Sequence, residues 1–143
     1  MTFEESLKLE RYRLVTERQK YFTDLAKETF GAYARTFAAF AAGAVALVSL
    51  KLQLGLEVEV VTGLVRMIAI LLTFAAVISI AQIIFCLLRW YGFRYAECEI
   101  NPKSPKPEPW AWLFEGMYAF GILVSIGVAW WGVDYIAVVL NTL

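Results

Sequence analysis

Three long apolar runs dominate the pattern of hydrophobic and polar positions along the chain. They extend over about residues 32–50, 62–88 and 112–140. A helix needs about 20 predominantly apolar residues to cross the hydrocarbon core of a bilayer, and each run reaches that length. The pattern therefore predicts an all-α membrane protein whose transmembrane domain, residues 32–143, is a bundle of three spanning helices.

The segment between the first two runs, KLQLGLEVEV at residues 51–60, has a different period. Leu or Val occupies every second position, which is typical of a half-buried β-strand. We expect an interfacial turn here, with Gly55 as the turn point, because the flanking spans form a hairpin. Two alternatives stay open. The segment either pairs as a strand with a second copy or extends the spans as helix, since Leu52, Leu56 and Val60 fit an i,i+4 stripe.

The chain before the first span has the pattern of a charged, amphipathic helix. We expect this helix over residues 1–31, with continuation into the first span, because no proline occurs before Pro102. Leu7, Leu14 and Tyr21 repeat at seven-residue spacing, although arginines occupy the intervening stripe positions. Two interpretations follow: a solvated helix that lies against its neighbour, or a helix that associates with copies of itself.

The distribution of positive charge predicts the orientation of the spans. Residues 1–35 and 89–109 together carry eleven of the 13 Lys and Arg residues. Connections rich in Lys and Arg remain in the cytoplasm. We therefore expect the N-terminus and the 89–109 connection, with its proline-rich linker at residues 100–110, on the cytoplasmic side. The turn between the first two spans and the C-terminus are expected on the outer side.

Composition narrows the class of protein further. Hydrophobic residues make up 60% of the chain, against about 45–50% in an ordinary soluble domain. The net charge of zero gives no reason to expect a nucleic-acid partner. The absence of histidine removes the commonest general base and metal ligand, and no catalytic motif is present. We expect a protein that is not an enzyme, with no catalytic residues, no metal site and no cofactor.

Charged residues at the ends of the spans are the first candidate functional group. Arg66 and Asp134 lie near the outer ends of the second and third spans, and Arg35, Arg89 and Glu115 lie near the inner ends. A charge in the hydrocarbon region costs about 2.5–3.5 kcal/mol on insertion scales. We expect either a structural clamp at each face, pairing Arg66 with Asp134 and Glu115 with an inner arginine, or a ring of charge at a pore mouth.

Small residues at four-residue spacing predict faces for close helix packing. They are Ala39 and Gly43 in the first span, and Gly121 and Ala129 in the third. Ser125 lies on the same stripe as Gly121 and Ala129.

Uncharged polar residues are the second candidate group. Ser79 and Gln82 share a face of the second span, and Gln82 is the only strongly polar uncharged side chain near the middle of the membrane. Such an amide needs a partner or water. Ser79, Gln82 and Ser125 are therefore either interhelical hydrogen-bonding groups or pore-lining residues.

The layout of residues 6–95 resembles a known family. A charged helix that runs into a span, LKLERYRLVTERQKYFTDLAKETFGAYARTFAAFAAGAVALVSL, followed by an outer turn and a second span, is similar to the SLATT-type small membrane effectors of bacterial antiviral defence. The third span departs from that layout. The resemblance implies homo-oligomerisation and membrane permeabilisation under the control of a partner, in the bacterial inner (plasma) membrane, and it assigns no residue a role.

These observations lead to one functional prediction and two alternatives. We expect a non-enzymatic membrane protein that homo-oligomerises and forms or gates a pore as a defence or toxicity effector. One alternative is a non-catalytic membrane subunit or anchor, which binds a cytoplasmic protein through the N-terminal helix and the 89–109 connection. The other is an immunity or exclusion protein. The surroundings of the charged and polar membrane residues distinguish pore from anchor, because burial by the same chain favours the anchor.

Overall fold

A computed structural model describes residues 3–104, 106–107, 110 and 112–142, and these form three α-helices with no strand. The helices are α1 (Phe3–Leu54), α2 (Val58–Ile100) and α3 (Leu113–Thr142). Each helix contains a stretch that is long and apolar enough to cross a membrane. The predicted all-α architecture with three spanning helices is confirmed, and the chain is an integral membrane protein.

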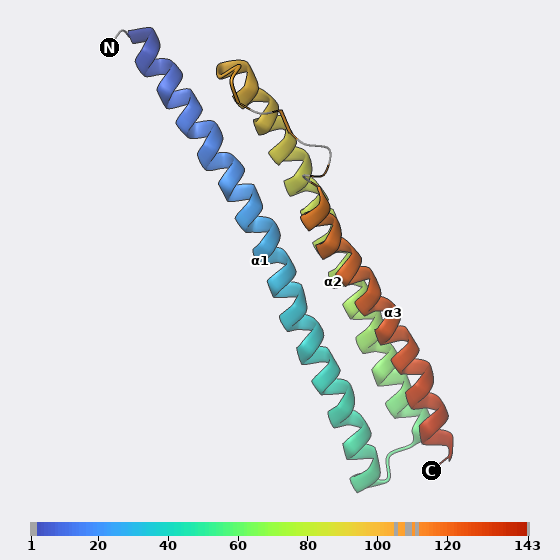
Figure 1. Ribbon diagram of the computed structural model, residues 1–143. Helices are drawn as coiled ribbons and strands as arrows, with labels where there is room; N and C mark the ends of the chain where they lie inside the picture. The colour runs from blue at the N-terminus through green and yellow to red at the C-terminus, as the bar shows by residue number, and fades with distance from the viewer. Residues whose placement is uncertain (1–2, 105, 108–109, 111, 143) are drawn as a thin grey trace.

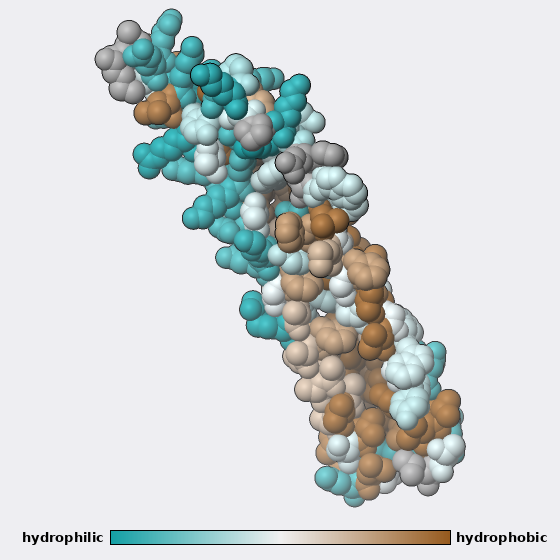
Figure 2. All heavy atoms as spheres, in the orientation of Figure 1, coloured by the Kyte–Doolittle hydropathy of each residue, from teal (hydrophilic) through white to brown (hydrophobic). Residues whose placement is uncertain are grey.

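Two of the helices are longer than a bilayer requires. The 52 residues of α1 and the 43 of α2 extend over roughly 78 Å and 65 Å at 1.5 Å per residue, whereas the hydrocarbon core is about 30 Å thick. Figure 1 shows α1 and α2 continuing together beyond the start of α3. We call residues 3–31 of α1 and 89–100 of α2, which lie beyond the apolar runs, the stalk. Its hydrophilic surface contrasts with the apolar surface of the remaining bundle (Figure 2).

The connection between α1 and α2 is a short turn rather than a strand. Helix α1 continues to Leu54, Gly55 has a positive φ of 66°, and α2 begins at Val58. The Gly55 N–H donates to the Lys51 carbonyl at 2.9 Å, which closes the last turn of α1. The expected turn at Gly55 is confirmed, and the strand alternative for KLQLGLEVEV is wrong. The helical alternative holds only up to Leu54 and again from Val58. The helices satisfy backbone groups that an unpaired strand would leave open near lipid.

Helix α2 packs along both α1 and α3, which contact each other much less. Two clusters of buried residues fill the bundle. The cluster nearer the stalk consists of Tyr33, Leu72, Ala76, Ile83 and Ile122, and the cluster nearer the turn consists of Val61, Val65, Ala69, Val133 and Leu140. Both draw on α2, so this helix organises the bundle. The N-terminus lies at one end of the molecule, and the C-terminus lies at the other end with the α1–α2 turn (Figure 1).

The turn yields a prediction about stability. Gly55→Ala is expected to destabilise the hairpin by about 1–2 kcal/mol, because the left-handed conformation costs other residues that much. Gly63→Ala is the matched control, since Gly63 is helical and an added Cβ meets no atom within 4 Å. The control is expected to keep or slightly raise stability. Unfolding by sodium dodecyl sulfate in mixed micelles, followed by circular dichroism, measures both variants, and equal effects would contradict the assignment.

Candidate functional site

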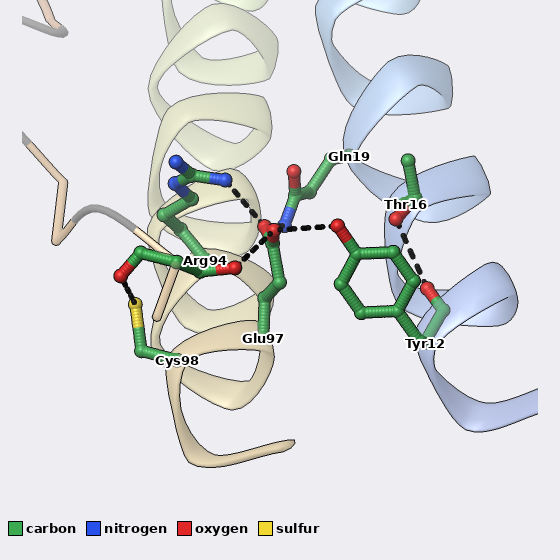
Figure 3. A network of polar contacts seen from close by, with 7 residues as sticks. Tyr12, Thr16, Gln19, Arg94, Glu97 and Cys98 are labelled. Atoms are coloured by element: carbon green, nitrogen blue, oxygen red, sulfur yellow. Dashed lines mark hydrogen bonds and ion pairs between the residues drawn. The ribbon is translucent and has the colours of Figure 1, made fainter. Parts of the chain in front are cut away.

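The most elaborate polar site of the stalk is centred on the carboxylate of Glu97, which is only 5% exposed. Tyr12 donates its hydroxyl to Oε1 at 3.3 Å, and Gln19 donates its amide to Oε2 at 2.8 Å. Ser104 donates to Oε1 at 3.1 Å, and Arg94 donates to Oε2 as an ion pair. Figure 3 shows Tyr12, Gln19 and Arg94 converging on the carboxylate. We call the five residues the Glu97 cluster.

Three segments that are distant in sequence meet at this carboxylate. Tyr12 and Gln19 lie seven residues apart, so they share one face of α1. Arg94 precedes Glu97 by three residues on α2, which brings the two side chains onto the same face. Ser104 follows the end of α2, and its N–H donates to the Asn101 carbonyl at 2.9 Å, which folds the chain back. The cluster therefore joins α1, α2 and the connection to α3.

Hydrogen bonds keep Glu97 ionised although it is buried. Burial by itself raises the pKa of the Glu97 carboxyl, but the hydrogen bonds from Gln19, Arg94 and Ser104 and the charge of Arg94 outweigh it, so that the pKa is lowered. A carboxylate that accepts several bonds is stabilised in its charged form. The cluster is thus a charged junction that depends on all of its donors.

Aromatic packing supports the same junction closer to the membrane. Phe22 of α1 stacks on Phe93 of α2, with ring centroids 5.8 Å apart, and contacts the edge of Phe85 at 6.2 Å. The guanidinium of Arg89 lies over the Phe85 ring at 5.4 Å from its centroid. The two helices of the stalk are therefore joined by an apolar contact and a polar one.

The sequence alone did not single out Glu97. Its one local signal is the i,i+3 spacing from Arg94, in a segment rich in aromatic residues. The decisive partners, Tyr12 and Gln19, precede it by 85 and 78 positions. A pairing at that separation requires the register between α1 and α2, which periodicity does not supply.

Among the predicted polar residues of the membrane, Ser125 is an interhelical group. Its oxygen lies 2.7 Å from the Tyr33 hydroxyl and 2.7 Å from the Ile122 carbonyl. Because the Ser125 proton goes to the carbonyl, Tyr33 is the donor to Ser125. This bond links α1 to α3, two helices that otherwise contact each other little.

Ser79 and Gln82 have different surroundings from Ser125. Both are partly buried on α2. Within residues 3–104, 106–107, 110 and 112–142, no side-chain hydrogen bond is formed by either of them. The Gln82 amide, a strong donor and acceptor, is therefore left without a hydrogen-bond partner within the described part of the chain.

The predicted charge pairs are absent from the described part of a single chain. Its ion pairs are Arg13–Glu17 and Arg94–Glu97, both in the stalk. The four charged residues Arg35, Arg66, Arg89 and Asp134 are exposed on the helices. Glu115 is partly buried, and its Oε2 atom has no hydrogen-bond partner.

Three of the four predicted small residues lie at helix contacts. A Cβ added to Gly121 would lie 3.6 Å from the Phe30 ring, and one added to Gly43 would lie 4.0 Å from Ile68. Ala129 packs against the cluster of buried residues nearer the stalk. Ala39, by contrast, is exposed on α1.

Comparison with protein families, curated proteins and solved structures found no match to this chain. Within the described residues, no group of three or more acidic or cysteine side chains is arranged to hold a metal ion. The geometry of the chain is therefore the basis for assigning a function.

The Glu97 cluster predicts how the stalk responds to mutation. Glu97→Gln is expected to weaken the junction by about 1–3 kcal/mol, because the hydrogen bonds to a charged carboxylate and its ion pair with Arg94 are lost. Hydrogen exchange of residues 8–26 in detergent micelles should become faster. Glu99→Gln is the matched control, since Glu99 is exposed. Equal exchange in the two variants would contradict a role for the cluster.

The cluster also predicts a dependence on pH. A lowered pKa in the folded chain means that the Glu97 contribution is complete above the ordinary pKa of 4.5 and is lost as the pH falls through the lowered value. The difference in hydrogen exchange between wild type and Glu97→Gln, compared at each pH, should persist down to about pH 4.5 and disappear as the pH falls through the lowered pKa of Glu97. Disappearance near neutral pH would show that the carboxyl is not held in its charged form.

Proposed function

We propose that this integral membrane protein homo-oligomerises through its spanning helices and forms or gates a pore, with its N-terminus and stalk in the cytoplasm. One observation carries the proposal. The spanning helices expose Arg66 and Asp134 and leave the Gln82 amide without a partner in the described part of the chain. A second copy supplies the missing partners.

Arg66 and Asp134 have opposite charges and lie at similar depths in their helices. Arg66 is eight residues from the start of α2, and Asp134 is eight residues from the end of α3, so each lies roughly 12 Å inside its helix end. Each charge costs about 2.5–3.5 kcal/mol when it is buried in hydrocarbon alone. An ion pair between Arg66 of one copy and Asp134 of the next relieves both costs.

The stalk offers a second surface for self-association. Leu7, Leu14 and Tyr21, the residues at seven-residue spacing, are 43%, 54% and 53% exposed. They lie beside the α2-facing side of α1, which buries Val15 and Ala26. Because copies in one membrane have the same orientation, their stalks run parallel. The exposed stripe of one copy therefore meets the same stripe of the next.

A polar path, if one forms, has to run between copies. The cavity of 210 Å³ among the three helices is lined only by apolar side chains and one glycine, Gly132. Ser79 and Gln82 are partly buried on α2. A neighbouring copy that packs against this helix would cover their remaining exposed surface. Polar side chains that converge from several subunits are the usual lining of a small pore.

The stalk provides the means of control. The Glu97 cluster and the Phe22 contacts hold α1 to α2 outside the membrane, and α1 continues without interruption into the first span. A partner that separates the stalk helices would act on the spanning helices through this continuous helix. The resemblance in layout to SLATT-type effectors supports a role in bacterial defence, at the inner (plasma) membrane.

A second candidate function is a non-catalytic subunit that binds another protein. It is favoured by an open groove of 450 Å³ at the tip of the stalk. The groove is lined by Glu5, Lys8, Leu9, Tyr12, Ile100 and Asn101. Its mixed polar and apolar lining suits a peptide segment of a cytoplasmic partner.

A charge exchange between copies tests the proposal. Arg66→Asp alone and Asp134→Arg alone place like charges opposite each other in every pair of identical copies, so each is expected to lose oligomers. Co-expression of the two variants restores complementary pairs only between unlike copies. Chemical cross-linking of membranes measures the oligomers, and a membrane-potential dye measures depolarisation of the cells. Both signals are expected to return on co-expression.

The same experiment separates the alternatives. If both single variants cross-link like the parent, the charges do not join copies, and the proposed interface is wrong. If oligomers form without depolarisation under any inducing condition, the subunit function is favoured over the pore. Gln82→Leu should retain cross-linking and reduce depolarisation, whereas Gln53→Leu, at the exposed outer end of α1, should change neither.

A further inference from the structure

A groove lies between the three helices, at the level where the stalk joins the spanning segments. It has a volume of 410 Å³. It is lined by Thr23 and Lys27 of α1, Trp90 of α2, and Phe114, Glu115 and Tyr118 of α3. All three helices contribute to the groove. Its lining includes one cation, one carboxylate and three aromatic rings.

The position of the groove corresponds to the level of the lipid headgroups. Lys27 lies five residues before the first apolar run, Trp90 lies two residues after the second, and Glu115 is in the first turn of α3. Tryptophan and tyrosine are enriched at this level, because their rings are apolar and their tips are polar. A molecule in the groove would contact headgroup chemistry on one side and the apolar helices on the other.

One oxygen atom of Glu115 has no hydrogen-bond partner, although a cation, Lys27, lines the same groove. The Glu115 Oε2 atom is buried and accepts no hydrogen bond, and a buried acceptor left unpaired is unfavourable. Lys27 lines the same groove, yet the two side chains form no ion pair within the described part of the chain. Thr23 already donates its hydroxyl to the Gln19 carbonyl at 3.2 Å. The site therefore holds a free acceptor and a free cation with space between them.

We propose that this groove binds the headgroup of an ethanolamine phospholipid from the surrounding leaflet. The primary ammonium would donate to Glu115, and the phosphodiester would accept from Lys27. A choline headgroup has the same charges but no N–H to donate. A glycerol headgroup presents its phosphate with no ammonium for Glu115. The acyl chains would lie along the exposed apolar surface of α3, which includes Met117 and Phe120. The proposal needs the membrane-spanning placement and does not depend on oligomerisation or on a pore.

Lipid binding to the purified full chain in detergent tests the site. Native mass spectrometry measures the binding of dioleoyl phosphatidylethanolamine, phosphatidylcholine and phosphatidylglycerol, which have the same acyl chains. Wild type is expected to bind the ethanolamine lipid about tenfold more tightly than the choline lipid, which corresponds to about 1.4 kcal/mol, because only the ethanolamine ammonium can donate a hydrogen bond to the Glu115 carboxylate. Equal binding of these two lipids, or tighter binding of the glycerol lipid, would overturn the proposal without any variant.

Two variants assign the contacts. Glu115→Gln should reduce the preference for ethanolamine over choline, because a neutral amide oxygen accepts a weaker hydrogen bond than a carboxylate. Lys27→Gln should weaken the binding of both lipids by a similar factor. Glu99→Gln and Lys20→Gln remove exposed charges elsewhere and should leave the preference unchanged. A preference that is undiminished in Glu115→Gln would contradict the assignment. Soluble phosphoethanolamine should not displace the lipid at equal concentration; displacement would show that the ligand is a soluble molecule.

Discussion

The thickness of the bilayer is the constraint on which the rest of this structure depends. A hydrocarbon core of about 30 Å accommodates about 20 helical residues, whereas α1 and α2 contain 52 and 43. The excess has to lie in water, and the short turn at Gly55 places it on a single side. The same two helices therefore pack in lipid at one end and in water at the other. Their sequence changes accordingly, from Leu-, Val- and Ala-rich segments to charged ones (Figure 2).

Water and lipid favour different kinds of contact between the same two helices. In water, burial of the Phe22 and Phe93 rings is favourable, and the ionised Glu97 can be held by four donors. In lipid, the burial of apolar surface between helices contributes little to the free energy of association. Close packing and hydrogen bonds such as Tyr33–Ser125 contribute more. Arg66, Asp134 and Gln82 have no ion-pair or hydrogen-bond partner within the described part of the chain, and the proposed contact between copies rests on them.

The spans, their number and the charged helix that continues into the first of them were predictable, because hydrophobic runs and the absence of proline are local signals. The alternation of KLQLGLEVEV left a strand open beside the turn at Gly55 that the structure contains. A helix end at an interface tolerates polar residues on every side, so Leu52 to Leu54 need no buried face. Ser125 was found as a candidate because four-residue spacing marks one helix face. Glu97 was missed because its bonds to Tyr12 and Gln19 depend on the register of two long helices. The pairing of Arg66 with Asp134 within one chain could not be judged from similar depth alone, because depth does not give the separation of two side chains.

Cysteine labelling of spheroplasts tests most directly whether lipid surrounds the three apolar segments and the stalk lies inside the cell. Single cysteines replace Gln53, beside the α1–α2 turn, and Lys103, in the connection after α2, in a chain that lacks Cys86 and Cys98. A membrane-impermeant maleimide should label Gln53→Cys in intact spheroplasts and Lys103→Cys only after lysis. Labelling of Lys103→Cys in intact spheroplasts, or recovery of the chain in the soluble fraction without detergent, would contradict the account.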